Sequence, residues 1–248
     1  MLDVKKKSNF LEAFSLKECE EYENAIGLAF TRMQILQYYM IFGGVPFYWS
    51  FLKKGFSMTQ NIDNILFAKD APLKKEFEYL YASIFQLIDN FTLFYYKFLQ
   101  NYPTDEHYWA NQVNTPSLNN WLGLAFERIC LEHINQIKVK LGISGVHTEV
   151  NSWYCKADSE KGIFGSQIDL LIARADQVIN MCEMKYSGTN YAIKQEEDEN
   201  IRKRISDLIN VTKNRCAVFP TLITTYGLSD NAYASNIQSV VTLDDLFV

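Results

Sequence analysis

Apolar positions follow two different patterns along the chain, and the change falls near residue 85. Before it, apolar residues recur at helical spacing, as at Leu36 and Met40, and Ser15 forms a capping box with Glu18, so we expect an all-helical region. The segment Gly43-Gly44-Val45-Pro46 interrupts this pattern. Beyond the interruption we expect helices over residues 48–52, 58–67 and 73–85.

After residue 115 the pattern becomes a long helix followed by apolar runs of strand length. Thr115-Pro116-Ser117 predicts the start of a helix over residues 118–141, and Gly142 predicts its end. We then expect strands over residues 147–154, 167–173 and 178–186, a charged helix over 196–212, and strands over 216–225 and 239–243. This order predicts an α+β fold, with an all-helical region over residues 1–85 and an α/β domain over residues 86–248, whose mixed sheet is flanked by helices.

Composition narrows the classes of protein that remain. With 48% hydrophobic and 21% charged residues, the chain is typical of a folded protein and not of a disordered one. The net charge of −5, all of it after residue 85, disfavours a broad basic face that coats nucleic acid but leaves a nuclease open. Five cysteines without a CxxC pair indicate neither a zinc ribbon nor a disulfide framework.

The sequence shows no targeting or membrane segment. The basic residues near the start are not followed by an apolar stretch, so we expect no signal peptide. The longest apolar run, residues 38–52, is short and contains two glycines and a proline, so we expect no membrane span. We therefore expect a cytoplasmic protein.

Two of the predicted strands carry the residues that suggest chemistry. Asp169 lies in the apolar run Gln167-Ile168-Asp169-Leu170-Leu171-Ile172, where a buried charge would need a partner or a metal ion. On the next strand, alternation puts Glu183 and Lys185 on one face. If residues 175–177 form the connecting turn, the strands are antiparallel neighbours, and Asp169 and Glu183 converge beside Lys185.

Two converging carboxylates would favour a Mg²⁺ or Mn²⁺ ion, which can activate water and stabilise charge on a phosphodiester. An adjacent Lys185 could hold the attacking water or offset the charge on the phosphate. The alternative without a catalytic role is a salt-bridged polar strip on an exposed face of the sheet. A carboxylate followed at loose spacing by Glu-x-Lys often arises by chance.

These strands resemble the PD-(D/E)XK restriction-endonuclease-like core, although Ile168 stands where the family's pattern has a proline. The resemblance implies a metal-dependent deoxyribonuclease in which Asp169, Glu183 and Lys185 are catalytic and Asp169, Glu183 and Glu127 hold the metal ion. It further implies a polar contribution from the later helix, for which Lys194, Gln195 and Arg202 are candidates. Lys194 and Arg202 would contact nucleic acid.

A second resemblance covers most of residues 15–248. Gln37-Tyr38-Tyr39-Met40-Ile41-Phe42-Gly43-Gly44-Val45-Pro46, followed by Asn61-Ile62-Asp63, is similar to the helical lid region of uncharacterised prokaryotic AAA+-type ATPases that end in a nuclease-like domain. This chain has no GxxxxGK[ST] motif, so we expect no ATP site. The chain then resembles such an ATPase without its P-loop domain, as a fragment, a rearranged product or a short paralogue.

Several readings stay open at this point. The nuclease-like domain could be catalytically inactive and serve as a module that binds DNA, an ATPase or another protein. Glu127 could be an ordinary carboxylate on a helix surface, and the charged stretch 194–204 a solvated helix face. The aromatic residues between 91 and 98 could stack on bases, but packing between the two halves is the interpretation that we favour.

Overall fold

The computed structural model describes residues 13–73, 90–100, 103–160, 162–213 and 215–248. The chain divides into two compact units, Met1–Val113 and Asn114–Val248. The boundary predicted between residues 85 and 86 lies outside the described residues, as does the helix predicted over 73–85 apart from Leu73.

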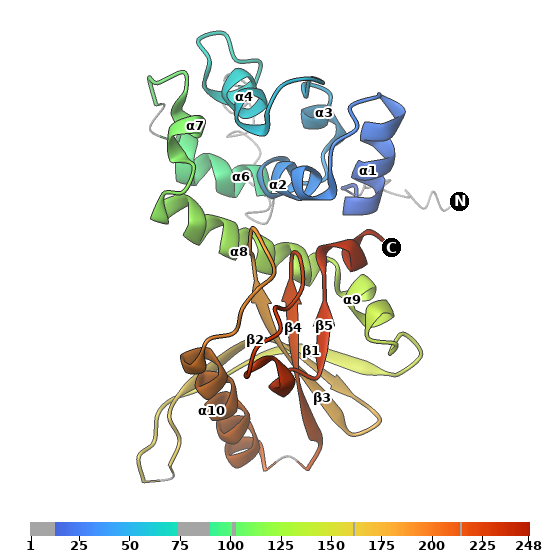
Figure 1. Cartoon of the computed structure of the whole chain (residues 1–248), viewed down its shortest axis with the longest axis vertical. Helices are drawn as coiled ribbons and strands as arrows, with labels where there is room; N and C mark the ends of the chain where they lie inside the picture. Colours follow the sequence, from blue (N-terminus) through green and yellow to red (C-terminus); the bar gives the residue numbers. More distant parts are fainter. Residues whose placement is uncertain (1–12, 74–89, 101–102, 161, 214) are drawn as a thin grey trace, which may run out of the picture. The chain divides into compact units, whose positions relative to one another are not determined.

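Every element described in the first unit is helical, as the apolar spacing predicts. The elements are α1 (Leu16–Ala25), α2 (Arg32–Phe42), α3 (Pro46–Trp49), α4 (Met58–Ile62), the π-helical turn η1 (Asp63–Phe67), α6 (Asn90–Phe94), the π-helical turn η2 (Tyr95–Leu99) and α7 (Tyr108–Gln112) (Figure 1). The predicted capping box of Ser15 and Glu18 is confirmed at the start of α1. Helix α3 is shifted to earlier residues than predicted because Pro46 takes its first position.

The Gly43-Gly44 break has a steric cause. Gly43 ends α2 with a positive φ of 59°, and its carbonyl accepts a hydrogen bond from the Trp49 indole at 2.8 Å. The backbone of Phe14 passes directly over Gly44 and donates to its carbonyl at 2.8 Å. A Cβ atom on Gly44 would lie 2.0 Å from the Phe14 carbonyl oxygen, so only glycine fits there.

Buried polar side chains join the helices of this unit. The Asn61 amide donates to the Tyr38 hydroxyl at 3.0 Å and to the Lys53 carbonyl at 3.1 Å. The Asp63 carboxylate accepts from the Trp109 backbone N–H at 2.8 Å, at the start of α7. Tyr38, Asn61 and Asp63 thus have structural roles within this unit.

The aromatic residues after position 90 also pack inside the first unit. The Phe91 ring lies 4.5 Å from Tyr48 and 6.1 Å from Phe42, and Phe94 lies 5.1 Å from Trp109, measured between ring centroids. Phe91 and Phe94 are fully buried. Packing across the predicted boundary, and not base stacking, is therefore the role of these two rings.

The second unit has the predicted order of helix, strands, helix and strands. Its elements are α8 (Pro116–Glu132), α9 (Ile134–Lys140), β1 (Thr148–Cys155), β2 (Ser166–Arg174), β3 (Val178–Lys185), α10 (Gln195–Thr212), β4 (Ala217–Thr224), a 3₁₀ turn η3 (Ala234–Asn236), β5 (Ser239–Val241) and a 3₁₀ turn η4 (Leu243–Phe247). The α+β fold is confirmed: helices come first, followed by a mixed sheet flanked by helices.

The single helix predicted over residues 118–141 is wrong in one respect, because it is broken at His133. The backbone of His133 leaves helical geometry, with φ −107° and ψ 30°. Its buried ring nitrogen Nδ1 donates to the Ile129 carbonyl at 2.8 Å, which holds the bend between α8 and α9.

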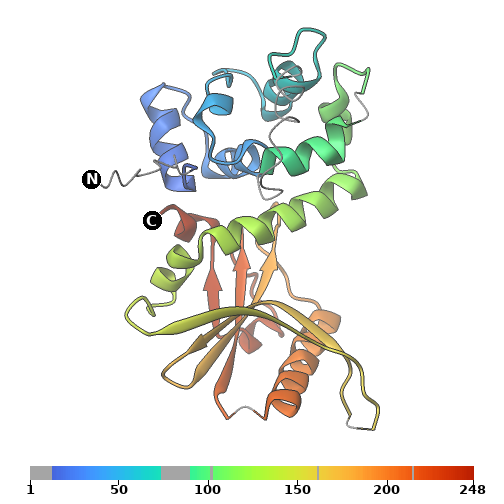
Figure 2. The ribbon, with the colours of Figure 1, turned by 180° about the vertical axis from the view of Figure 1, so that it is seen from behind.

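The five strands form one sheet in the order β1-β2-β3-β4-β5. β1, β2 and β3 are antiparallel neighbours, with the turn 175–177 joining β2 to β3 as predicted, whereas β4 and β5 run parallel to β3. The C-terminal ends of β3, β4 and β5 point toward α8 (Figure 2).

Two helices cover β3 from different sides. On one face, Ile201 and Leu208 of α10 pack against Leu171 and Met181 in a buried apolar cluster. Cys182, the next residue of β3, points the other way, toward α8. Burial of each such large apolar side chain contributes about 1.5–3 kcal/mol, so α10 is held firmly against the strands that carry the predicted site.

Candidate functional site

Asp169 occupies a β-bulge at the point where β2 stops pairing with β3. Between the pairs Asn151↔Leu171 and Trp153↔Ile168, β1 has one residue and β2 has two, Asp169 and Leu170. The β2–β3 ladder ends at Leu170↔Cys182, so Asp169 and Glu183 are the next residues of the two strands beyond the last ladder pair. A β-bulge changes the direction in which the local side chains point, and here the bulge includes the carboxylate residue Asp169.

Asp169 is exposed and not buried, so the burial penalty expected for it does not arise. Its carboxylate accepts a hydrogen bond from the Gln167 side-chain amide at 2.8 Å.

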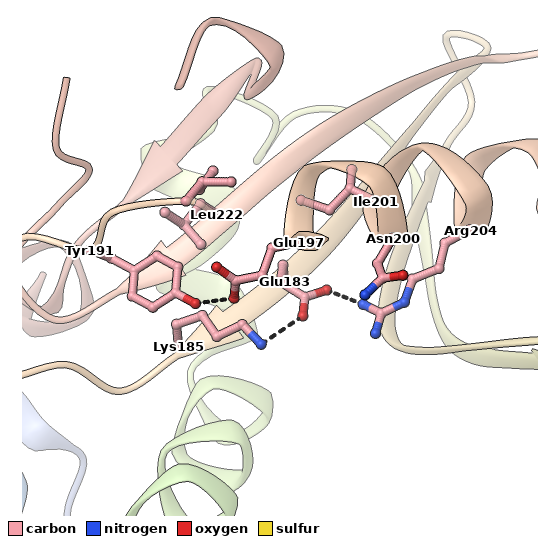
Figure 3. Close-up of a pocket in the computed structure, with 9 residues that line it drawn as sticks. Glu183, Lys185, Tyr191, Glu197, Asn200, Ile201, Arg204 and Leu222 are labelled. Atoms are coloured by element: carbon pink, nitrogen blue, oxygen red, sulfur yellow. Dashed lines mark hydrogen bonds and ion pairs between the residues drawn. The ribbon is translucent and has the colours of Figure 1, made fainter. Parts of the chain in front are cut away.

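Glu183 lies between two cations in a small pocket of about 90 Å³ (Figure 3). Lys185 Nζ lies 3.0 Å from Glu183 Oε1, and the Arg204 guanidinium of α10 pairs with Glu183 Oε2. The pocket is lined by Glu183, Lys185, Tyr191, Ile193, Glu197, Asn200, Ile201, Arg204 and Leu222. Glu183 and Lys185 share the face of β3 that looks toward α10, as alternation predicts.

Glu127 of α8 is close enough to Asp169, Glu183 and Lys185 for their charges to affect its pKa. Burial raises its pKa, the Asp169 and Glu183 carboxylates raise it further, and the Lys185 ammonium opposes them. Within the described residues Glu127 makes no hydrogen bond or ion pair, and it is partly buried.

Tyr191 and Glu197 also line this pocket. The Tyr191 hydroxyl donates to Glu197 Oε1 (Figure 3). The other oxygen of this carboxylate, Glu197 Oε2, accepts from the Lys194 backbone N–H at 3.2 Å. Burial raises the pKa of Tyr191, and its hydrogen bond to Glu197 and the charges of Glu197 and Glu183 raise it further. Tyr191 is thus a neutral hydrogen-bond donor beside the charged residues.

The candidates named on the later helix fall outside this pocket's lining. Arg202 pairs with the buried Asp198 of the preceding turn, and the Gln195 amide donates to Glu199 at 2.9 Å. Lys194 is exposed at the start of α10. Arg204, and not Arg202, reaches the predicted site.

A periodicity argument favours Arg204 only slightly. Ile201, Ile205 and Leu208 form the apolar stripe by which α10 meets the sheet. On a helix with 3.6 residues per turn, Arg204 lies about 40° from Leu208 on one side of this stripe, and Arg202 lies about 60° from Ile205 on the other side.

The donor chemistry of the predicted metal ligands fits Mg²⁺, because carboxylate oxygens are the ligands that this ion prefers. Across the residues that the structure describes, however, no group of three or more histidine, cysteine, aspartate and glutamate side chains is arranged to hold a metal ion. Both oxygens of Glu183 are already paired with cations. A metal ion at Glu183 would therefore have to replace one of them.

No helix in the described part of the chain has both the length and the hydropathy of a membrane span.

The proteins to which this chain is similar are themselves described as being of unknown function. Residues 90–201 match a family described as archaeal and bacterial proteins of unknown function (DUF234). This segment contains Glu127, Asp169, Glu183 and Lys185 and ends before Arg204. No curated protein matches the chain significantly.

A solved structure titled as the protein of unknown function AF1548 is 18% identical, with a TM-score of 0.32. The match covers 47% of this chain and 62% of that one, so the chain spans less than two thirds of that protein's length.

Proposed function

We propose that the unit Asn114–Val248 is a metal-dependent phosphodiesterase of the PD-(D/E)XK type that acts on DNA. One observation supports the proposal: Asp169 and Glu183 are the first residues beyond the end of the β2–β3 ladder on two neighbouring strands, and Lys185, two residues further along β3, pairs with Glu183. The charges of Asp169, Glu183 and Lys185 all act on the pKa of Glu127 in α8, which supports the inclusion of Glu127 in the same site.

Each residue then has a distinct role. Asp169 and Glu183 would hold Mg²⁺ or Mn²⁺, and Glu127 would complete the ligand set. When bound, this ion would supply positive charge to stabilise the developing negative charge on the phosphodiester. The Lys185 ammonium orients the attacking water or a phosphate oxygen.

In the reaction, a water oxygen forms a bond to phosphorus while the phosphorus–oxygen bond to the leaving group breaks. The water gives up a proton, and the leaving oxygen takes one up. Lys194 and Arg202 are the proposed contacts to the DNA backbone outside the pocket. Because the unit is acidic overall, we expect this contact to be weak and sensitive to salt.

A second function is favoured by a specific observation. Lys185 and Arg204 neutralise Glu183 without a metal ion, so the fold is electrostatically satisfied as it stands. The unit could then be a catalytically inactive module that binds DNA or a protein. A separate ATPase is the partner implied by the resemblance of the first unit to an AAA+-type lid.

Cleavage assays on plasmid and single-stranded DNA with Mg²⁺ or Mn²⁺ test the nuclease proposal. We expect metal-dependent cleavage by the wild type that Asp169→Ala and Lys185→Ala reduce by at least about 100-fold. Glu149→Gln is the matched control, because Glu149 is an exposed carboxylate of β1 in the same unit.

The outcomes separate the two functions. Cleavage that persists in Asp169→Ala and Lys185→Ala would come from a contaminating enzyme. If the wild type cleaves nothing and gains no thermal stability with Mn²⁺, the binding module becomes the better account.

A further inference from the structure

The two cations on Glu183 come from different elements and are anchored differently. Lys185 belongs to the same strand, two residues along, whereas Arg204 reaches Glu183 from α10 across the pocket (Figure 3). The Arg204 side chain is 32% exposed, so its guanidinium has access to solvent and to a ligand at the pocket mouth.

Arg204 also lacks any other carboxylate partner among the described residues. The neighbouring cations of α10 are engaged elsewhere: Arg202 pairs with Asp198, and Lys203 lies over the Phe164 ring at 5.9 Å. The hold of Arg204 on the site therefore depends on Glu183 alone.

We propose that Arg204 is a latch on Glu183, which occupies the carboxylate oxygen that a divalent ion needs. The latch opens when Arg204 moves to a phosphate of nucleic acid, because a guanidinium pairs with phosphate as well as it does with carboxylate. Metal and nucleic acid then bind cooperatively: the phosphate removes the competing cation, and the metal ion takes its place at Glu183.

This inference rests on the proposed function, and it makes Arg204 a positioning residue that acts through Glu183. It differs from a purely structural role, in which loss of Arg204 would weaken the site. A latch predicts the opposite sign, since removal of a nearby positive charge strengthens the binding of another cation.

Direct Mn²⁺ binding to the full chain, followed by the electron paramagnetic resonance of free Mn²⁺, tests the latch without any activity assay. We expect Arg204→Gln to bind Mn²⁺ about five- to tenfold more tightly than the wild type. Arg204→Lys keeps the charge and should bind close to the wild-type affinity. Lys203→Gln removes the same charge from the same helix and should change the affinity less than twofold. Asp169→Asn identifies binding at this site.

A short phosphorothioate duplex, used as a probe that resists cleavage, tests the cooperativity. It should tighten Mn²⁺ binding several-fold in the wild type and have little effect in Arg204→Gln. If Arg204→Gln binds Mn²⁺ equally or more weakly while Asp169-dependent binding persists, the latch is overturned and the nuclease proposal stands. If neither wild type nor Arg204→Gln shows Asp169-dependent Mn²⁺ binding, both are overturned.

Discussion

Asp207 shows how a single buried side chain fastens α10 to the ribbon of β1 and β2. Its fully buried carboxylate accepts from the Phe164 backbone N–H at 3.1 Å and from the Ser166 hydroxyl at 2.5 Å. We expect Asp207→Ala to lower the free energy of unfolding by about 2–4 kcal/mol, because both donors lose their acceptor inside the protein.

Urea denaturation followed by circular dichroism measures this loss. Asp207→Asn is the control, since its amide oxygen can still accept one of the two bonds and the loss should be smaller. A loss below about 1 kcal/mol for the alanine variant would mean that water replaces the carboxylate at both donors.

The five cysteines divide by burial into two partly exposed and three buried thiols. Cys19, Cys130 and Cys182 are buried, whereas Cys155 and Cys216 are partly exposed. Burial, and secondarily the Glu183 charge, raises the pKa of Cys182 to about 12. Since the thiolate is the nucleophile, a thiol reagent such as DTNB at about pH 8 should modify two cysteines promptly and three only after unfolding.

Absorbance of the released chromophore gives this count directly. Cys182→Ser should leave the prompt count unchanged and reduce the count in denaturant by one. A third prompt thiol that appears in the wild type and is lost in Cys182→Ser would show that the region between α8 and β3 opens readily in the native state.

For single residues, the sequence predicts which side chains share a face of one strand better than it predicts which side chains of different elements meet. Alternation along β3 was enough to put Glu183 and Lys185 on one face. The candidates on the later helix are Lys194, Gln195 and Arg202, whereas the structure brings Arg204 to Glu183. A run of charges on a helix identifies the facing residue only when the apolar stripe beside it is used to orient the helix.

At the scale of elements, the close approach of Phe14 to Gly44 controls how α2 leads into α3. We expect Gly44→Ala to lower the free energy of unfolding by more than about 2 kcal/mol, because its Cβ would meet backbone atoms that cannot move aside. Thermal and urea unfolding of the purified variant measure this effect.

Gly123 provides the opposite control for the same substitution. It lies inside α8, and a Cβ added there meets nothing within 4 Å. Gly123→Ala should therefore stabilise the protein by about 0.5–1 kcal/mol through its helix propensity. If Gly44→Ala is as stable as the wild type, the backbone of residues near Phe14 is free to move away from α2.

Apart from the break at His133, the predicted strands and helices of the second unit have bounds within two residues of those observed, because each apolar run ends at a polar turn. The break at His133 was not predictable in the same way. Its cause is the pairing of a buried ring with a carbonyl one turn earlier, and a histidine within an apolar helical pattern gives no sign of that pairing.

At the scale of the whole molecule, the order of elements follows from the sequence, whereas the position of the site depends on register. Asp169 lies in the bulge of β2 and one residue beyond the end of the ladder between β2 and β3. Neither feature has a signature in the residues themselves, since Asp169 and Leu170 are ordinary members of an apolar run. The sequence alone therefore could not predict the position of Asp169 relative to the neighbouring strands.

The division of the chain into two units makes a last prediction about where the metal site resides. Every residue assigned to it, including Arg204, lies in Asn114–Val248, and this unit has its own apolar cluster between α10 and the sheet. We expect a fragment of residues 114–248 to fold and to unfold cooperatively. Mn²⁺ should stabilise it as much as it stabilises the full chain, by about 2.7 kcal/mol at a concentration one hundred times its Kd.

Differential scanning calorimetry of both proteins with and without Mn²⁺ makes the comparison, and Asp169→Asn in each should abolish the shift. A fragment that folds but gains nothing from Mn²⁺, while the full chain does, would mean that the first unit contributes to the site. A fragment that does not fold would mean that the apolar cluster of α10 and the sheet is too small to sustain the unit, and that the helical unit stabilises it.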